Sequence, residues 1–156
     1  MTRQTLQTGA APESADGAPA GRLGIVIVAH GALASALMEA LEHVVGKLEN
    51  ASAIAIQPAD DLHARQGEID AAVAAADEGA GVVLVTDMFG GTPSNLALGA
   101  MTRPGIEVIY GANLPLLVKL AKCRSRGMEE AVRIALEAGM KYIDSAGRML
   151  EPAPRD

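Results

Sequence analysis

Two short segments of the chain carry side chains that could do chemistry together. His30 follows a run of apolar, mostly β-branched residues, and Asp87 follows another such run. A carboxylate beside an imidazole can accept the Nδ1–H of the ring, which fixes the tautomer and leaves a lone pair on Nε2. A neighbouring pair of this kind would prepare His30 to act as a nucleophile.

The residues directly after His30 predict an anion site. Gly31 and Ala32 lie where a helix is expected to begin, and no Ser, Thr, Asp or Asn is placed to cap its first amides. Free amides at a helix N-terminus bind anions, and the helix macrodipole favours negative charge there by about 0.3–1 kcal/mol. A nucleophilic histidine beside an anion site suggests a phosphoryl group carried on nitrogen.

The segment that begins at Asp87 could contact the same anion. Gly90 and Gly91 provide a permissive backbone that could approach a phosphoryl group, and Thr92 could add a hydroxyl. Each residue also has a purely structural interpretation. Asp87 could begin a turn, the two glycines could form one, and Thr92 followed by Pro93 could be the N-cap of a helix. The sequence leaves these alternatives open.

Strand and helix patterns alternate along the chain and predict an α/β fold. Short, mostly apolar runs predict four strands, at residues 23–29, 51–56, 81–86 and 106–110. Helical spacing and helix-end signals predict five helices, at residues 32–45, 62–77, 92–101, 114–123 and 128–138. Strands buried on both faces indicate an open, mostly parallel four-stranded sheet with helices on both faces. Residues 141–144 fit either a helix end or a short edge strand.

The predicted sheet determines where the functional residues should lie. Open α/β sheets place their sites outside the carboxyl ends of the strands. The first and third strands are commonly neighbours in such sheets, so we expect His30 and Asp87 to lie side by side. His63, at the start of the second helix, is a minor candidate for the same edge.

Met88 and Phe89 predict a docking surface. Both are large apolar residues in a short loop beside His30, where little core is available to bury them. We therefore expect at least one to be exposed, and an exposed apolar patch next to a reactive group could bind a partner protein. The alternative is that both pack beneath the loop onto the third helix.

Length and composition limit the other possibilities. The chain has 156 residues, which fits one domain at residues 23–150, flanked by a disordered tail at 1–22 and a short tail at 151–156. The net charge of −6 and the 2% aromatic content argue against nucleic-acid binding. Cys123 is the single cysteine, and no histidine pair has ligand spacing, so we expect no metal and no cofactor. No secretory signal or membrane insertion is expected, which indicates a cytoplasmic protein.

Three stretches together resemble a known family. They are GIVIVAHG at residues 24–31, TDMFGGTPSN at 86–95 and GANLPLL at 111–117. In this order and spacing the chain resembles the IIA component of the mannose family of the bacterial phosphoenolpyruvate:sugar phosphotransferase system (PTS), from residue 23 to about residue 143. The IIA-like component of dihydroxyacetone kinase systems fits less well, because residues 92–95 resemble the sugar-system motif.

The resemblance implies a role for each matching residue. His30 would be phosphorylated on Nε2, Asp87 would hold the other ring nitrogen, and the hydroxyl of Thr92 would contact the phosphoryl group. The family fold implies a homodimer that exchanges a fifth, antiparallel edge strand. The phosphoryl group would come from the phosphohistidine of HPr and leave to a IIB component, without any cofactor.

Two other functions remain open from the sequence. Many family members carry a IIB domain on the same chain, and we expect IIB to be separate if this chain ends at Asp156. Without a IIB domain, the protein could instead be a regulatory phosphohistidine module whose phosphorylation state controls a partner protein. A small-molecule binding domain is a further alternative.

Overall fold

The computed structural model describes residues 21–150, so residues 1–20 of the tail expected at 1–22, and the whole tail expected at 151–156, lie outside the described part of the chain. The described residues form these elements: β1 Gly24–His30, α1 Leu33–Val45, β2 Ala51–Ile56, α2 Leu62–Ala76, β3 Val82–Thr86, α3 Thr92–Gly99, the 3₁₀ helix η1 Ala100–Thr102, β4 Ile106–Ile109, α4 Leu114–Lys122, α5 Met128–Lys141 and α6 Ala146–Leu150.

The strands form one parallel sheet in the order β2-β1-β3-β4. This confirms the predicted open α/β fold and the neighbouring positions of the first and third strands. The register pairs Val28 of β1 with Thr86 of β3. His30 and Asp87 therefore follow these paired residues at the same edge of the sheet.

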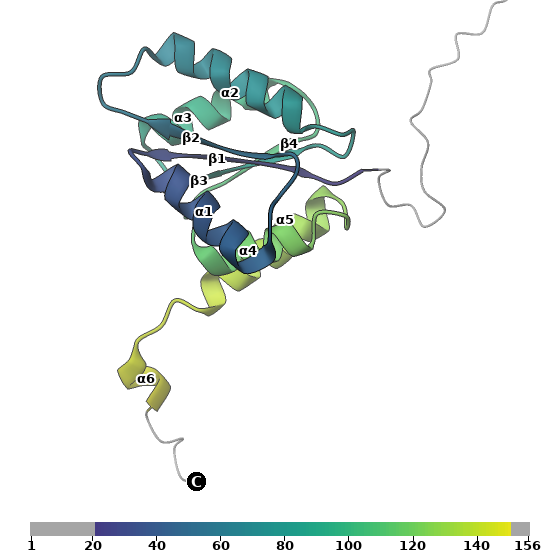
Figure 1. Cartoon of the computed structure of the whole chain (residues 1–156). Helices are drawn as coiled ribbons and strands as arrows, with labels where there is room; N and C mark the ends of the chain where they lie inside the picture. Colours follow the sequence, from purple (N-terminus) through teal and green to yellow (C-terminus); the bar gives the residue numbers. More distant parts are fainter. Residues whose placement is uncertain (1–20, 151–156) are drawn as a thin grey trace, which may run out of the picture.

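Two helical layers enclose the sheet, with α2 and α3 on one face and α1, α4 and α5 on the other (Figure 1). Side chains along β1 alternate between the layers: Ile25 and Ile27 pack with α1 and α4, whereas Val26 and Val28 pack with α2 and α3. Both faces of β1 are thus apolar, which explains why the strand is an unbroken apolar run in the sequence.

The end of the chain differs from the sequence-based expectation. Helix α5 continues to Lys141, beyond the predicted end at residue 138. Glycine lowers helix propensity, but Gly139 is buried where a Cβ would lie 3.0 Å from the Cβ of Leu116 in α4. The close packing of two helices keeps this glycine helical.

Residues after α5 form no fifth strand within the described part of the chain. They form the short helix α6, which extends away from the layered body (Figure 1). The exchange of an edge strand between two subunits therefore stays a prediction of the family resemblance.

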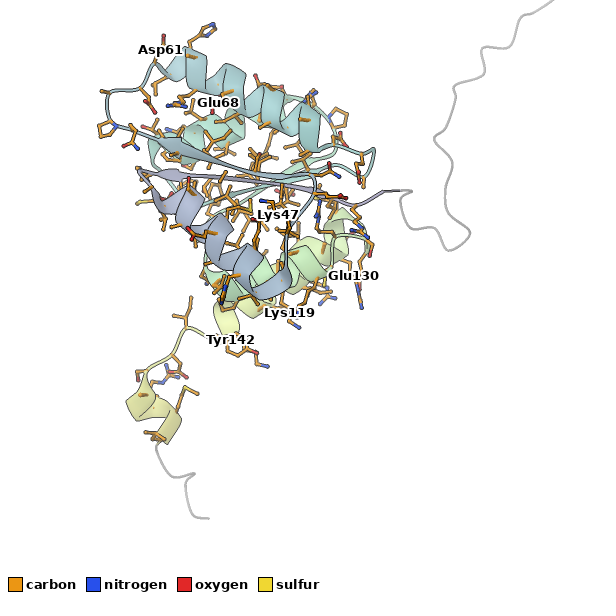
Figure 2. All side chains as sticks on the ribbon, in the orientation of Figure 1. Lys47, Asp61, Glu68, Lys119, Glu130 and Tyr142 are labelled. Carbon is orange, nitrogen blue, oxygen red and sulfur yellow. The ribbon has the colours of Figure 1, made fainter. Side chains whose placement is uncertain are left out.

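Most charged side chains lie on the outer surface, as Asp61, Glu68 and Glu130 do in Figure 2. Arg124 is an exception, with only 4% of its surface exposed. Its Nε donates to the carbonyl oxygen of Leu23 at 2.6 Å, and Nη2 donates to the carbonyl of Glu49 at 2.8 Å. The guanidinium therefore joins the α4–α5 connection to the segments that directly precede β1 and β2.

We expect Arg124→Met to destabilise the fold by about 1–3 kcal/mol, because the carbonyls of Leu23 and Glu49 lose their hydrogen-bond donor. Arg126→Met is the matched control. Arg126 is exposed and forms a surface ion pair with Glu130 at 3.0 Å, and such pairs contribute about 1 kcal/mol or less. Urea unfolding of both variants measures the difference. Equal losses in the two variants would show that the buried guanidinium has no special role in stability.

Candidate functional site

The structure brings His30 and Asp87 together. The Nδ1 of His30 lies 2.8 Å from one carboxylate oxygen of Asp87, and the backbone N–H of His30 donates to the same oxygen at 3.0 Å. An ionised carboxylate can only accept hydrogen bonds, so Nδ1 carries the proton. In the neutral ring Nε2 then holds the free lone pair, which is the arrangement that the sequence suggested.

Asp87 is held in its charged form by its surroundings. Burial by itself would raise the pKa of this carboxyl, since its side chain is only 12% exposed. Hydrogen bonds from the backbone and ring of His30, the charge interaction with His30 and a 3.0 Å bond from the Met88 amide outweigh burial. The pKa of Asp87 therefore lies below its ordinary value, and the group orients the imidazole as a carboxylate.

The opposite side of the imidazole faces the start of α3. Gly91, which directly precedes this helix, lies against the Cε1–Nε2 side of the ring. No hydrogen bond from another described residue reaches Nε2, and the His30 side chain is half exposed. Nε2 therefore has no hydrogen-bond partner among the described residues, on a half-exposed ring that lies beside a helix N-terminus.

The prediction that Thr92 is the N-cap of this helix is wrong. Gly91 is the N-cap, Thr92 is the first helical residue and Pro93 the second. The buried hydroxyl of Ser94 accepts hydrogen bonds from the amides of Gly90 and Gly91 and donates to the carbonyl of Gly91. Because Ser94 satisfies the turn from within the helix, Gly91 takes the N-cap position and the Thr92 hydroxyl has no capping role.

The glycine amides expected to bind an anion already have acceptors. The amide of Gly31 donates to the carbonyl of Ile56 at 2.8 Å, and those of Gly90 and Gly91 donate to Ser94. Helix α1 begins with Ala32 as its N-cap and has no side-chain cap, as predicted. Its first amides have no intrahelical acceptor, so they remain the unpaired donors on this side of His30.

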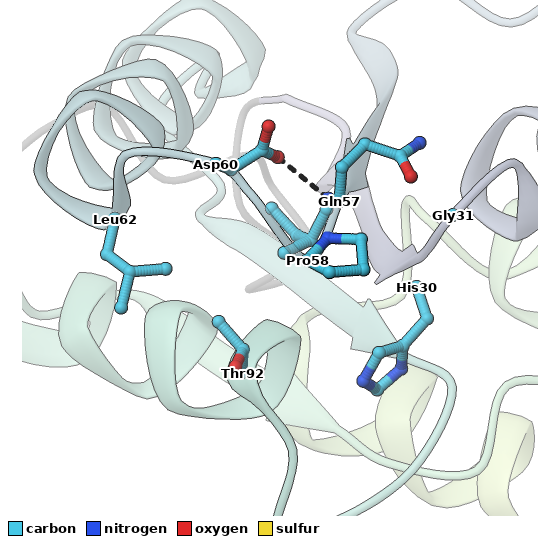
Figure 3. Close-up of a pocket in the computed structure, with 8 residues that line it drawn as sticks. His30, Gly31, Gln57, Pro58, Asp60, Leu62 and Thr92 are labelled. Atoms are coloured by element: carbon cyan, nitrogen blue, oxygen red, sulfur yellow. Dashed lines mark hydrogen bonds between the residues drawn. The ribbon is translucent and has the colours of Figure 1, made fainter.

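A pocket of about 580 Å³ opens beside His30 (Figure 3). Its lining comes from the ends of β1 and β2 with the loops that follow them, and from the first residues of α2 and α3: His30, Gly31, Ile56, Gln57, Pro58, Asp60, Leu62 and Thr92. The loop at residues 57–61 follows the carboxyl end of β2, where the sequence placed the site in general, but no role was assigned to its side chains. Asp60 shapes this loop by accepting a 2.7 Å hydrogen bond from the Gln57 amide.

His63 does not join the site. It is exposed at the start of α2, its amide donates to Asp61, and it does not line the pocket. The position of His63 gives no support to its candidacy as a second reactive histidine.

Met88 and Phe89 are both exposed, as expected for their short loop, with 55% and 70% of their surfaces accessible. The rings of Phe89 and Tyr110 meet in a T-shaped contact at a centroid distance of 5.0 Å. Tyr110 follows β4, and nothing in the sequence marked it as a support for this loop. The contact holds Phe89 in one place while leaving most of the ring accessible.

Two further features bear on the site. Within residues 21–150 no three His, Cys, Asp or Glu side chains are grouped to hold a metal ion. No helix in this part of the chain is both long and apolar enough to cross a bilayer.

Comparison with known proteins identifies the family. The family model described as "PTS system fructose IIA component" (EIIA-man) matches residues 24–136, which is most of the chain. The chain belongs to the EIIA-man family of PTS IIA components. The matched region includes His30, Asp87 and the whole of the segment 87–95.

Curated relatives from the PTS support the assignment to the EIIA-man family. The mannose-specific EIIAB component of Escherichia coli is 32% identical over 124 residues, which cover 78% of this chain and 38% of that protein. The sorbose-specific EIIA component of Lacticaseibacillus casei is 32% identical over 100 residues, covering 62% of this chain and 70% of that protein. The chain thus matches only 38% of the length of the EIIAB relative.

Solved EIIA structures share the fold. A PTS IIA protein associated with the fucose utilization operon of Streptococcus pneumoniae has a TM-score of 0.75 at 22% identity, covering 83% of this chain and 97% of that one. The mannose/sorbose-specific IIA subunit of Enterococcus faecalis has a TM-score of 0.72 at 23% identity, covering 86% and 98%. These similarities confirm the architecture of the sheet and its helices.

The lowered pKa of Asp87 predicts how acid affects the site. Stability from its charged form is fully present above the unfolded-state pKa of about 3.9 and is lost as the pH falls through the lower pKa in the folded protein. We therefore expect the difference in unfolding free energy between wild type and Asp87→Asn to shrink between pH 5 and pH 3. Urea titrations at each pH measure this difference. Asp70→Asn, at an exposed position of α2, controls for the loss of one negative charge. A difference that stays constant over this range would contradict the assignment.

Proposed function

We propose that this protein is a phosphoryl carrier of the PTS that accepts a phosphoryl group from the phosphohistidine of HPr onto Nε2 of His30. It then passes the group to a IIB component. The observation that carries the proposal is the half-exposed imidazole whose Nδ1 is bonded to Asp87 and whose Nε2 has no hydrogen-bond partner among the described residues. Membership in the EIIA-man family supports it. A carrier that exchanges phosphate with HPr would work in the cytoplasm.

The proposed reaction moves one phosphoryl group between two ring nitrogens. The lone pair of Nε2 forms the new P–N bond as the P–N bond of HPr breaks, and that electron pair stays on the HPr ring. The proton on Nδ1 of His30 remains in place, so the phosphorylated ring carries positive charge. The Asp87 carboxylate at 2.8 Å stabilises this charge. Transfer to IIB reverses these steps, and the protein contributes mainly position and electrostatics.

Thr92 is the side chain that we assign to the phosphoryl oxygens. Its hydroxyl is not used for capping, and Thr92 lines the same pocket as His30. The unpaired amides in the first turn of α1, which follow Gly31 and Ala32 in the chain, are further hydrogen-bond donors for the phosphoryl oxygens. Because the amides of Gly90 and Gly91 are bonded to Ser94, these glycines support the site by their backbone shape.

An apolar rim around His30 would bind HPr and IIB. We use this name for Leu62, Met88 and Phe89, which are 52%, 55% and 70% exposed. A donor histidine must approach Nε2 in line, so any partner that transfers the group has to cover this edge. The acidic side chain of Asp61 is exposed directly before Leu62, whereas Asp60 is paired with Arg65 at 2.9 Å, so we expect the partner to bind mainly through an apolar face.

We propose that the C-terminal arm, by which we mean residues 140–150, binds a second copy of the chain. Large apolar side chains of this arm are mostly exposed: Met140, Tyr142, Ile143, Met149 and Leu150. Strand β4 forms one edge of the sheet and has no partner on its outer side within the described residues. Exchange of this arm between two subunits would bury both features.

We expect His30→Ala to abolish phosphorylation. Wild-type protein incubated with phosphoenolpyruvate, enzyme I and HPr should gain acid-labile, base-stable phosphate. Asp87→Asn should become phosphorylated more slowly, because an amide can favour the wrong tautomer of the ring. His63→Ala is the matched control and should label normally.

Two results of this experiment would count against the proposal. Full labelling of His30→Ala would place the phosphate on another residue. An unchanged rate in Asp87→Asn would show that the carboxylate does not prepare the ring. Adding a IIB protein to the labelled carrier then tests the second step, and phosphate that stays on His30 would favour the regulatory alternative.

We expect Phe89→Ala to weaken binding of HPr or IIB by about 1–3 kcal/mol, since an exposed aromatic anchor at the centre of an interface contributes that much. Stability should change little, because the ring is 70% exposed. Val44→Ala is the control, at a 51% exposed position in the last turn of α1. Titration calorimetry with HPr and with IIB measures the affinities. Normal binding of both partners, or unfolding of the variant, would assign Phe89 to the loop structure alone.

A further inference from the structure

The two adjacent glycines at the start of α3 are required for different reasons. Gly90 has a φ of +84°, which L-residues rarely adopt, and a Cβ built on it would meet nothing within 4 Å. Gly91 has φ −109° and ψ 175°, a conformation open to any residue. The backbone therefore explains the glycine at position 90 but not the one at position 91.

The His30 ring explains the second glycine. A Cβ built on Gly91 would lie 2.8 Å from Cε1 and 3.1 Å from Nε2 of His30. The next nearest atom, Cδ of Pro93, is 3.6 Å away and in ordinary contact. The space that a side chain at position 91 would need is thus occupied by the imidazole.

The ring is confined on both sides. The bond from Nδ1 to Asp87 holds one side at 2.8 Å, and the position where a Cβ of residue 91 would lie borders the other side. A methyl group at position 91 would force the ring away from its place. Since the His30 side chain is 49% exposed, the ring would yield more easily than the start of α3, where Pro93 and Ser94 are buried.

Ser94 makes this arrangement compatible with a helix start. Position 91 is an N-cap, where Ser, Thr, Asp and Asn are preferred because their side chains bind the first amides. Each of them would place a Cβ against His30. The hydroxyl of Ser94 instead accepts from the Gly91 amide at 3.2 Å and donates to the Gly91 carbonyl at 2.9 Å. It fixes Gly91 from within the helix.

We propose that Gly91 is a positioning residue for His30, whose missing side chain leaves the space that the imidazole occupies and keeps the ring between Gly91 and Asp87. The position of the ring is a property of the unphosphorylated protein alone. The effect on phosphoryl transfer rests on the proposed function.

The test compares Gly91→Ala with Gly67→Ala. Gly67 is an exposed glycine of α2 where a Cβ would meet nothing within 4 Å. Long-range proton–nitrogen correlation spectra of the imidazole report the ring without any partner protein. We expect Gly91→Ala to shift the Nδ1 and Nε2 signals of His30 and to slow phosphorylation from HPr about 10- to 100-fold. Gly67→Ala should change neither.

A double-mutant cycle with His30→Ala keeps the proposal testable if Gly91→Ala unfolds. Any loss in unfolding midpoint caused by Gly91→Ala should disappear in the His30→Ala background, because the ring that it contacts is gone. Unchanged His30 signals in a folded Gly91→Ala, or the same loss of stability with and without the ring, would overturn the proposal. If wild type took no phosphate from HPr, the carrier function would fail while the ring spectra still decided the role of Gly91.

Discussion

The hydrogen bond between Nδ1 of His30 and Asp87 joins residues that lie 57 positions apart in the sequence. It can form only because β1 and β3 are adjacent parallel strands that end at the same edge of the sheet. Both strands are buried on both faces, so the two helical layers fix the strand ends and therefore the pair. The chemistry of the site follows from this contact, since it determines which nitrogen is free and where that nitrogen faces.

The sequence was sufficient for the architecture because burial leaves a direct pattern. A strand covered on both faces is apolar throughout, so the two central strands β1 and β3 and their parallel arrangement could be predicted from runs such as the one before His30. The edge strands β2 and β4 are only partly buried and contain Ser52 and Glu107, but short, mostly apolar runs still marked them. The rule that sites lie at the carboxyl ends of strands then brought His30 and Asp87 to one edge. The distance of 2.8 Å between Nδ1 of His30 and the carboxylate of Asp87 agrees with that reasoning.

Details that depend on tertiary contacts could not be predicted in the same way. The N-cap of α3 is Gly91 because the hydroxyl of Ser94, three residues later, satisfies the turn. In the sequence, Thr92 followed by Pro93 matches the usual N-cap pattern, so the sequence alone favours Thr92. Gly139 stays helical because of the close packing against Leu116. The side chains of Gln57 and Asp60 border the pocket through the folding of one loop, which no periodic pattern describes.

The position of the phosphate on the imidazole tests the central claim most directly. Protein labelled with ¹⁵N-histidine and phosphorylated through HPr would show phosphorus–nitrogen coupling at the nitrogen that carries the group. With Nδ1 held by Asp87, the account predicts coupling to Nε2 of His30, with the proton retained on Nδ1. Coupling to Nδ1 of His30, or to the ring of His43 or His63, would contradict it.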